Sequence, residues 1–348
     1  MRKLLCPVCR EAVFFEQLQC SHCDTQLAFD VENRRLCILE RDSACANRLL
    51  IGCNWLGRGN RYCVSCCLTR TIPNLASTRN ILLWRRVEQA KRRLIYDLYR
   101  LALPSKNQER QIAFDILSEE TAGHPIMTGH LNGLITFGLS EADDVEREAR
   151  RIAFREPYRT LLGHFRHEVG HFYWDLLVDQ TNLKIPFRLI FGDETQSYDD
   201  LLKSYHARAD RLYDRTSFIS EYATAHPWED WAETFAHFLH IVSTLDSASM
   251  LPSSSGERLL QLSEDPYQET DFSALLASWR SVAYIMNELN RSMGLSDAYP
   301  FDLSQAVRGK LHFVHMAILN YRDRTRQKVP TLVEDGAQKL RAAADANC

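Results

Sequence analysis

The residues best suited to chemistry lie in LLGHFRHEVGHFYWDLL, residues 161–177. His167 and His171 are four positions apart, so on a helix their rings stand on one face and can bind one metal ion. Glu168 is rotated by about 100° from His167 and can accept a proton from a water at that ion. Two imidazole ligands and a carboxylate base are the components of zinc-dependent hydrolysis. The stretch therefore predicts a catalytic zinc site.

His164 lies one turn before His167, on nearly the same side of this helix. The neighbouring side chains are mostly apolar, so burial of the helix would leave its histidines in need of partners, which a metal supplies. Three roles remain open for His164: contact with a ligand residue, contact with a substrate, or no role beyond that of an ordinary core or surface histidine.

A catalytic zinc needs a third protein ligand and an open position. The best candidate ligand lies in EYATAHPWEDWAETFAHFLH, residues 221–240, where Pro227 can begin a helix. Glu229 and Glu233 then share one side of a mostly apolar helix. Glu229 as ligand and Glu233 as hydrogen-bond acceptor from a ligand histidine would account for both. The reverse assignment, His237 as the ligand, and a solvated acidic stripe without metal are the alternatives.

Ten of the 11 cysteines lie in residues 1–67. The turns CPVC and CSHC, about ten residues apart, each offer two thiolates, which is the geometry of a zinc ribbon. A second group can be built around CVSC, with buried free thiols as the alternative; Cys67 competes with Cys66, and Cys37 is a candidate extra ligand. The predicted ligands of the two structural zinc ions are Cys6, Cys9, Cys20 and Cys23, and Cys45, Cys53, Cys63 and Cys66. With the catalytic site, we expect three zinc ions.

The composition is that of an ordinary globular protein, with 45% hydrophobic and 25% charged residues and a net charge of −3. No apolar run approaches the ~20 residues that span a bilayer. The start, MRKLLCPVCRE, lacks the apolar segment of a secretory signal. We therefore expect a cytoplasmic protein without a membrane partner, in which cysteines bind metal instead of forming disulfides.

The charge is divided unevenly along the chain. Residues 1–110 contain 19 basic and 10 acidic side chains, whereas residues 111–348 contain 23 and 35. Such asymmetry indicates two domains with different roles. Two four-thiolate zinc sites would each carry a net charge of −2, which reduces the basic excess to about +5. Because no basic stripe with interleaved aromatic residues is present, we expect scaffolding or docking of a protein partner, and not nucleic acid.

The apolar patterns predict the elements that position these residues. Residues 1–36 read as short strands between cysteine pairs, IAFDILSEE as a helix, and LNGLITFGL (131–139) as one strand. Further helices are predicted at 79–104, 198–215, 228–245, 272–293 and 304–324. A polar loop is expected at 247–256. The fold class is α+β: a zinc-ribbon region (1–75), a linker helix (76–105), a mostly helical domain with a small β-sheet (106–330) and a weakly ordered tail (331–348).

HEVGH, Tyr222 and EDWAE together resemble the motifs of gluzincin metallopeptidases, and within them of the lethal-factor-like zinc peptidases. Their pattern is H-E-x-G-H, then a tyrosine, then E-x-x-A-E on a helix. Over nearly its whole length, including CNWL (53–56) and RTIPNL (70–75), the chain resembles a bacterial family of zinc-binding metallopeptidases with an N-terminal zinc ribbon. The resemblance implies a zincin-like domain with Glu229 as third zinc ligand and Glu233 behind a ligand histidine. Tyr222 would donate a hydrogen bond to the developing oxyanion.

The expected function is therefore hydrolysis of peptide bonds in a peptide or protein substrate, with Glu168 as base. GLITFGL is expected either as an edge strand that pairs with an extended peptide or as a core strand. Three rival functions remain: a zinc protein that binds or regulates without turnover, a zinc-ribbon protein of nucleic-acid transactions, and an amidohydrolase acting on a small amide.

Overall fold

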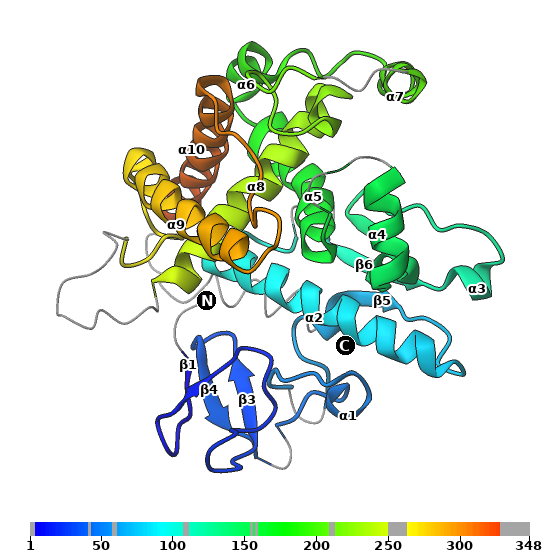
Figure 1. The fold of residues 1–348 in the computed structure, drawn as a ribbon, viewed down its shortest axis with the longest axis vertical. Coiled ribbons are helices and arrows are strands. Elements are labelled where there is room, and N and C mark those ends of the chain that lie inside the picture. Colours follow the sequence, from blue (N-terminus) through cyan, green and yellow to red (C-terminus); the bar gives the residue numbers. More distant parts are fainter. Residues whose placement is uncertain are drawn as a thin grey trace. The chain divides into compact units, whose positions relative to one another are not determined.

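The computed structural model describes residues 4–40, 43–57, 61–106, 111–153, 156, 159–208, 213–249 and 263–327. The chain divides into two compact units, with the boundary between Ala149 and Arg150. Small sheets dominate the start of the first unit and helices the second, so the α+β prediction is confirmed (Figure 1). The expected tail (331–348) and most of the expected loop at 247–256 lie outside the described residues.

Two short antiparallel hairpins begin the first unit, as the cysteine spacing predicts. The first pairs β1 with β2 and the second pairs β3 with β4 (Figure 1). Their bounds are Leu4–Leu5 for β1, Ala12–Val13 for β2, Leu27–Asp30 for β3 and Arg35–Ile38 for β4. Helix α1 (Arg48–Ile51) and the 3₁₀ turn η1 (Cys66–Leu68) follow. These strands are too short to make a large core, which is typical of metal-stabilised modules.

A four-stranded sheet with the order β5-β6-β8-β7 forms the rest of the first unit. Strands β5, β6 and β8 run parallel to one another, and β7 pairs antiparallel with β8. The bounds are Thr69–Thr71 for β5, Ala113–Leu117 for β6, Gly129–Leu131 for β7 and Leu134–Gly138 for β8. The short helices α3 (Glu119–Ala122) and η2 (Leu139–Ala142) belong to this part, and helix α4 (Asp144–Ala153) spans the boundary between the two units.

Two predictions for this sheet were wrong. Most of IAFDILSEE is strand β6 and not a helix, because Ala113–Leu117 pairs on both sides and buries Phe114 and Ile116 in a short apolar run; only its last two residues, Glu119 and Glu120, are helical, in α3. The segment 131–139 is not one strand: Asn132 and Gly133 have φ of 52° and 87° and form the turn of the β7–β8 hairpin. Since β8 lies between β6 and β7, it is a core strand and not the edge.

Helix α2 (Thr78–Arg100) confirms the predicted helix at 79–104 and ends ahead of Pro104. Its side chains Glu88 and Lys91 are fully buried and form an ion pair of 2.8 Å. The Thr69 hydroxyl of β5 donates to the same carboxylate at 2.6 Å. A buried charge needs such partners, so this network fixes α2 against the sheet.

The second unit is helical, and α5 and α8 form its centre (Figure 1). The bounds are Leu161–Trp174 for α5, Lys184–Phe191 for α6, Tyr198–Ala207 for α7, Pro227–Ala248 for α8, Phe272–Ser292 for α9 and Gln305–Gln327 for α10. A π-helical turn, η3 (Asp175–Asp179), continues α5, and η4 (Tyr222–Thr224) precedes α8. The predictions for α8, α9 and α10 are confirmed. Helix α7 ends at Ala207, earlier than predicted, and the predicted helical end near residue 215 is instead a turn in which the Asp214 side chain accepts hydrogen bonds from Thr216 and Ser217.

Gly170 allows α5 to approach α8 closely. A Cβ atom at this position would stand 3.0 Å from the Cα atom of Ala232. The indole nitrogen of Trp231 donates to the Gly170 carbonyl at 2.9 Å, and Trp231 is fully buried. The close approach of α5 and α8 places residues 167–171 opposite residues 229–233.

Gly170→Val should lower the free energy of unfolding by about 1–3 kcal/mol, because the added methyl groups must push α5 and α8 apart. The measurement is the midpoint of chemical denaturation. Gly309→Val is the matched control: a Cβ there, in α10, meets nothing within 4 Å. Equal stability of the two variants would mean that the close approach of α5 and α8 does not require glycine at position 170.

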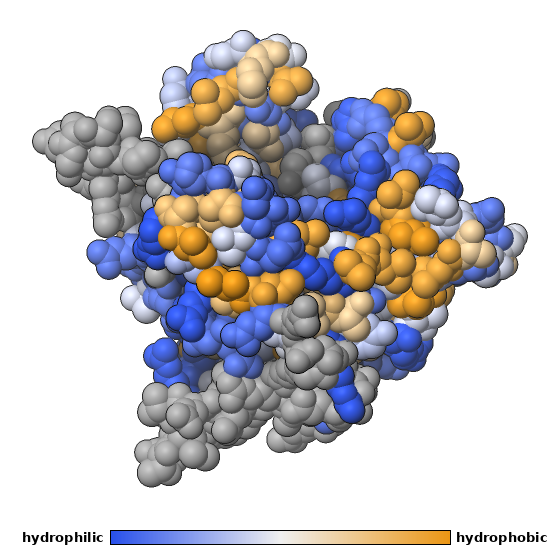
Figure 2. Space-filling model, turned by 90° about the horizontal axis from the view of Figure 1, so that it is seen from below, coloured by the Kyte–Doolittle hydropathy of each residue, from blue (hydrophilic) through white to orange (hydrophobic). Residues whose placement is uncertain are grey.

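None of the described helices is long and apolar enough to cross a membrane. Figure 2 shows a mainly hydrophilic face interrupted by apolar patches. Among the described residues, several large apolar side chains are highly exposed, including Phe14, Leu49, Met127, Val145 and Leu189.

Candidate metal sites

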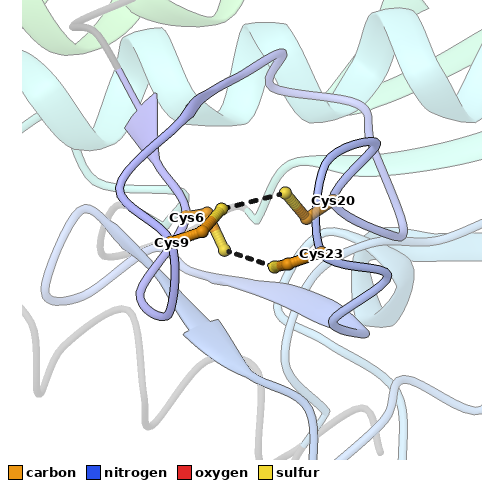
Figure 3. Close-up of side chains that lie close together, drawn as sticks. All are labelled: Cys6, Cys9, Cys20 and Cys23. Atoms are coloured by element: carbon orange, nitrogen blue, oxygen red, sulfur yellow. Dashed lines mark hydrogen bonds between the residues drawn. The ribbon is translucent and has the colours of Figure 1, made fainter.

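Cys6, Cys9, Cys20 and Cys23 converge as the spacing predicts (Figure 3). Cys6 and Cys23 are 3.6 Å apart between sulfur atoms, and so are Cys9 and Cys20. A disulfide would need about 2.05 Å, whereas zinc–sulfur bonds of about 2.3 Å in a tetrahedron place the sulfurs about 3.8 Å apart. Hydrogen bonding with Thr25 lowers the pKa of Cys23 to about 6, which favours the thiolate that a metal binds. The cluster therefore fits a four-sulfur zinc site.

Cys45, Cys53, Cys63 and Cys66 form the second cluster, and all four are buried. Cys53 lies 3.6 Å from Cys63 and 3.9 Å from Cys66, again close to the spacing around a tetrahedral zinc. Two other cysteines are not part of it. Cys37 donates to the Ala28 carbonyl, and Cys67 is disulfide-bonded, with its sulfur 3.7 Å from the Tyr62 carbonyl oxygen.

Arg92 of α2 is nearly fully buried beside this second cluster. Burial would lower the pKa of its guanidinium, but the nearby thiolates, Cys53 first, raise it. A buried cation at this position offsets the negative charge that four thiolates would bring. Cys348, which the cysteine count left unassigned, lies outside the described residues.

The third candidate site joins α5 to α8. The Oε2 atom of Glu229 lies 3.0 Å from Nε2 of His167 and 3.5 Å from Nε2 of His171. All three side chains are buried, and Glu229 Oε2 accepts no hydrogen bond from the described residues. Ligands at about 2.0–2.1 Å from a tetrahedral zinc would be about 3.3 Å apart. The spacing of these three atoms therefore fits one zinc ion.

Local structure explains how the three ligand atoms meet. The Thr160 hydroxyl caps α5 by accepting from the Gly163 backbone at 3.0 Å. His171 follows His167 by four positions, about one helical turn, and their ring centroids are 4.9 Å apart. Pro227 begins α8, so Glu229 lies in its first turn, where the helix dipole favours a negative charge.

Glu233 lies behind the first histidine. Its Oε1 atom accepts from Nδ1 of His167 at 2.7 Å, and its Oε2 atom accepts from the Ser220 hydroxyl at 2.6 Å. Burial would raise the pKa of Glu233, but these hydrogen bonds and the nearby imidazoles lower it to about 2. A carboxylate on Nδ1 orients the ring and leaves Nε2 to face the metal. His237 instead hydrogen-bonds to Tyr299 at 2.9 Å and is not among the converging residues.

Glu168 and Tyr222 are both neighbours of the ligand residue His167, Glu168 as the next residue of α5. Glu168 is 9% exposed, and the ring of Tyr222 is 5.7 Å from that of His167. Burial raises the pKa of Tyr222 above its usual range, and the negative charges of Glu229 and Glu168 raise it further. Tyr222 therefore remains a hydrogen-bond donor at neutral pH. His164 is half-buried one turn away and is not part of the cluster.

Tyr198 of α7 is a member of the site that the sequence motifs do not identify. Its hydroxyl donates to Oε1 of Glu229 at 2.8 Å. Burial, and then the charge of Glu229, raises the pKa of this phenol as well. No spacing rule could have found it, because the contact depends on where α7 packs in three dimensions.

A buried ion pair supports the start of α8. Lys310 of α10 donates to Asp230 at 2.6 Å and to the Ser217 carbonyl, also at 2.6 Å. One ammonium group thus joins the residue after Glu229 to the segment that carries Ser220 and Tyr222. Asp230 is fully buried, and the ammonium group of Lys310 compensates the negative charge of its carboxylate.

Comparisons with known proteins agree with this arrangement. Residues 80–317 match the family model described as "Putative zinc-binding metallo-peptidase", and residues 3–77 match that of a zinc-ribbon domain. Uncharacterized proteins of Mycobacterium bovis and Mycobacterium tuberculosis are each 38% identical to the chain over 332 residues, covering 91% of it and 95% of their own length. No solved structure matches the chain. The chain thus belongs to the zinc-binding metallopeptidase family of that description, with a zinc-ribbon domain at its N-terminal end.

Proposed function

We propose that the protein hydrolyses peptide bonds at the site formed by α5 and α8, with zinc held by His167, His171 and Glu229. The observation that carries the proposal is the convergence of these three ligand atoms beside Glu168 and Tyr222. We further propose that the two cysteine clusters hold structural zinc, which gives three zinc ions per chain, and that the ribbon region docks a protein partner.

Each residue then has a distinct task. A bound zinc ion would supply an acidified water and polarise the scissile carbonyl. Glu168 accepts the proton of the attacking water and delivers it to the leaving amine. Tyr222 donates a hydrogen bond to the oxygen of the scissile carbonyl as negative charge develops there. Glu233 holds the ring of His167 in the orientation that ligation requires.

A peptide-library cleavage assay tests the proposal. We expect cleavage of internal peptide bonds by the full-length protein, loss of cleavage with a chelator, and recovery when zinc is restored. Absence of any cleavage by metal-loaded protein would favour a binding or regulatory role. Turnover of small amides alone would instead favour an amidohydrolase.

Tyr222→Phe should keep the metal at the site and lower kcat by about 10²–10³-fold, because one donor to the oxyanion is removed. KM should change little, since the hydroxyl acts mainly in the transition state. Tyr205→Phe is the control: Tyr205 is a buried neighbour whose hydroxyl donates to Glu221 at 3.2 Å. If Tyr222→Phe retains the wild-type kcat, Tyr222 is not the oxyanion donor.

A further inference from the structure

Helix α7 contacts the candidate site through two tyrosines. Tyr198 and Tyr205 are seven positions apart, so they lie on the same side of the helix. Tyr198 donates to Glu229, and Tyr205 donates to Glu221, the residue before Tyr222. The remaining residues of α7 are exposed or half-buried. The inward side of α7 is thus used for polar contacts with the segments that form the site.

The two oxygen atoms of Glu229 have different surroundings. Oε2 faces both imidazole Nε2 atoms, at 3.0 Å from His167 and 3.5 Å from His171, and accepts no hydrogen bond from the described residues. Oε1 accepts the hydroxyl hydrogen bond of Tyr198 at 2.8 Å. A carboxylate can bind a metal through one oxygen or through both, and a hydrogen bond on one oxygen leaves the other as the ligand.

We propose that Tyr198 is a positioning residue of the metal site: by holding Oε1, it makes Glu229 a ligand through Oε2 alone. The consequence is a compact three-ligand set that leaves one coordination position open for water or substrate, as a catalytic site requires. The proposal rests on the proposed function only in taking Glu229 as a ligand of the metal.

Tyr198→Phe isolates the hydroxyl group. The Tyr198 ring packs with its centroid 5.3 Å from that of His226 and 6.0 Å from that of Trp228, and phenylalanine keeps both contacts. Without the hydroxyl, Oε1 of Glu229 would be a buried oxygen with its donor removed, since Glu229 is 1% exposed. The Glu229 carboxylate can replace the lost hydrogen bond by rotating so that Oε1 also contacts the metal.

The first measurement is metal affinity. Zinc at the site should bind about 10–100-fold more weakly in Tyr198→Phe, the usual loss when a group that orients a ligand is removed. Competition with a chromophoric chelator reports this constant, and the metal held by the cysteine clusters should be released at the same chelator concentration as in the wild type. An unchanged affinity would overturn the proposal.

The second measurement is the visible absorption of cobalt-substituted protein. Four-coordinate cobalt absorbs strongly, and each added ligand weakens the bands. Tyr198→Phe should therefore show weaker bands than the wild type, because Glu229 binds through both oxygens. An unchanged spectrum would overturn the assignment of Tyr198 to the coordination mode.

Tyr205→Phe is the matched control, since it removes the other inward hydroxyl of α7 and leaves Glu229 untouched. We expect wild-type affinity and spectrum for this variant. If it reproduces the changes of Tyr198→Phe, the position of α7 and not the hydroxyl on Glu229 is responsible, and the proposal fails. Because neither measurement uses a peptide, failure to cleave would count against the proposed function and leave this inference standing.

Discussion

Glu168→Gln should retain the metal and lose about 10²–10⁴-fold in kcat, the range that a positioned general base contributes. Glutamine has nearly the same shape as glutamate but cannot take a proton from water at neutral pH. Glu168 is not one of the three ligand residues, so the metal content should be that of the wild type. Mass analysis of the metal and steady-state cleavage of a library-derived peptide measure the two quantities on one sample.

Two observations make this substitution informative. Glu168 is buried directly after the ligand residue His167 in α5, and its negative charge contributes to the raised pKa of both Tyr198 and Tyr222. Glu146→Gln is the control, because Glu146 is exposed on α4. A Glu168→Gln protein that cleaves as fast as the wild type would mean that another group is the base.

The sequence could predict those site residues whose relation is local. His167, Glu168 and His171 lie on one helix, and Glu229 and Glu233 lie on another, so helical geometry alone relates the members of each group. The two helices meet because Gly170 permits close packing against Ala232, which no spacing rule states. The need for a third ligand and the two carboxylates on an apolar helix suggest the link between the groups, and the resemblance to a family singles out Glu229. The distances of 3.0 Å and 3.5 Å agree with that assignment.

The parts that could not be predicted depend on tertiary contacts. A strand buried on both sides is a short apolar run, which periodicity cannot separate from a helix, and for this reason the pattern predicts a helix where β6 lies. The pattern also predicts one strand at 131–139, because apolar residues flank the turn signal Asn132-Gly133 on both sides. Tyr198 contacts Glu229 across 31 positions in sequence, through the packing of α7.

His167→Ala should remove one metal ion per chain and all measurable cleavage. The substitution deletes one ligand atom and also the donor to Glu233 at 2.7 Å. The buried carboxylate of Glu229 and the half-buried carboxylate of Glu233 would then face a site with one imidazole, and removing a partner from a buried charge is costly. Wild-type protein should contain about three zinc ions, and the variant should contain about two, because four-cysteine sites lie elsewhere in the chain.

Native mass spectrometry of the intact chain counts the ions directly. His164→Ala is the matched control, since His164 lies on the same helix one turn earlier and is not one of the three converging residues. We expect this control to keep the full metal content. If His164→Ala loses the ion and His167→Ala retains it, the metal ligand is His164 and not His167. The hydrogen bond between His167 and Glu233 would then not serve to orient a ligand. Full metal content in both variants would mean that no metal binds at this site. Without His167 only Glu229 and His171 would remain, and a catalytic zinc site uses three protein ligands.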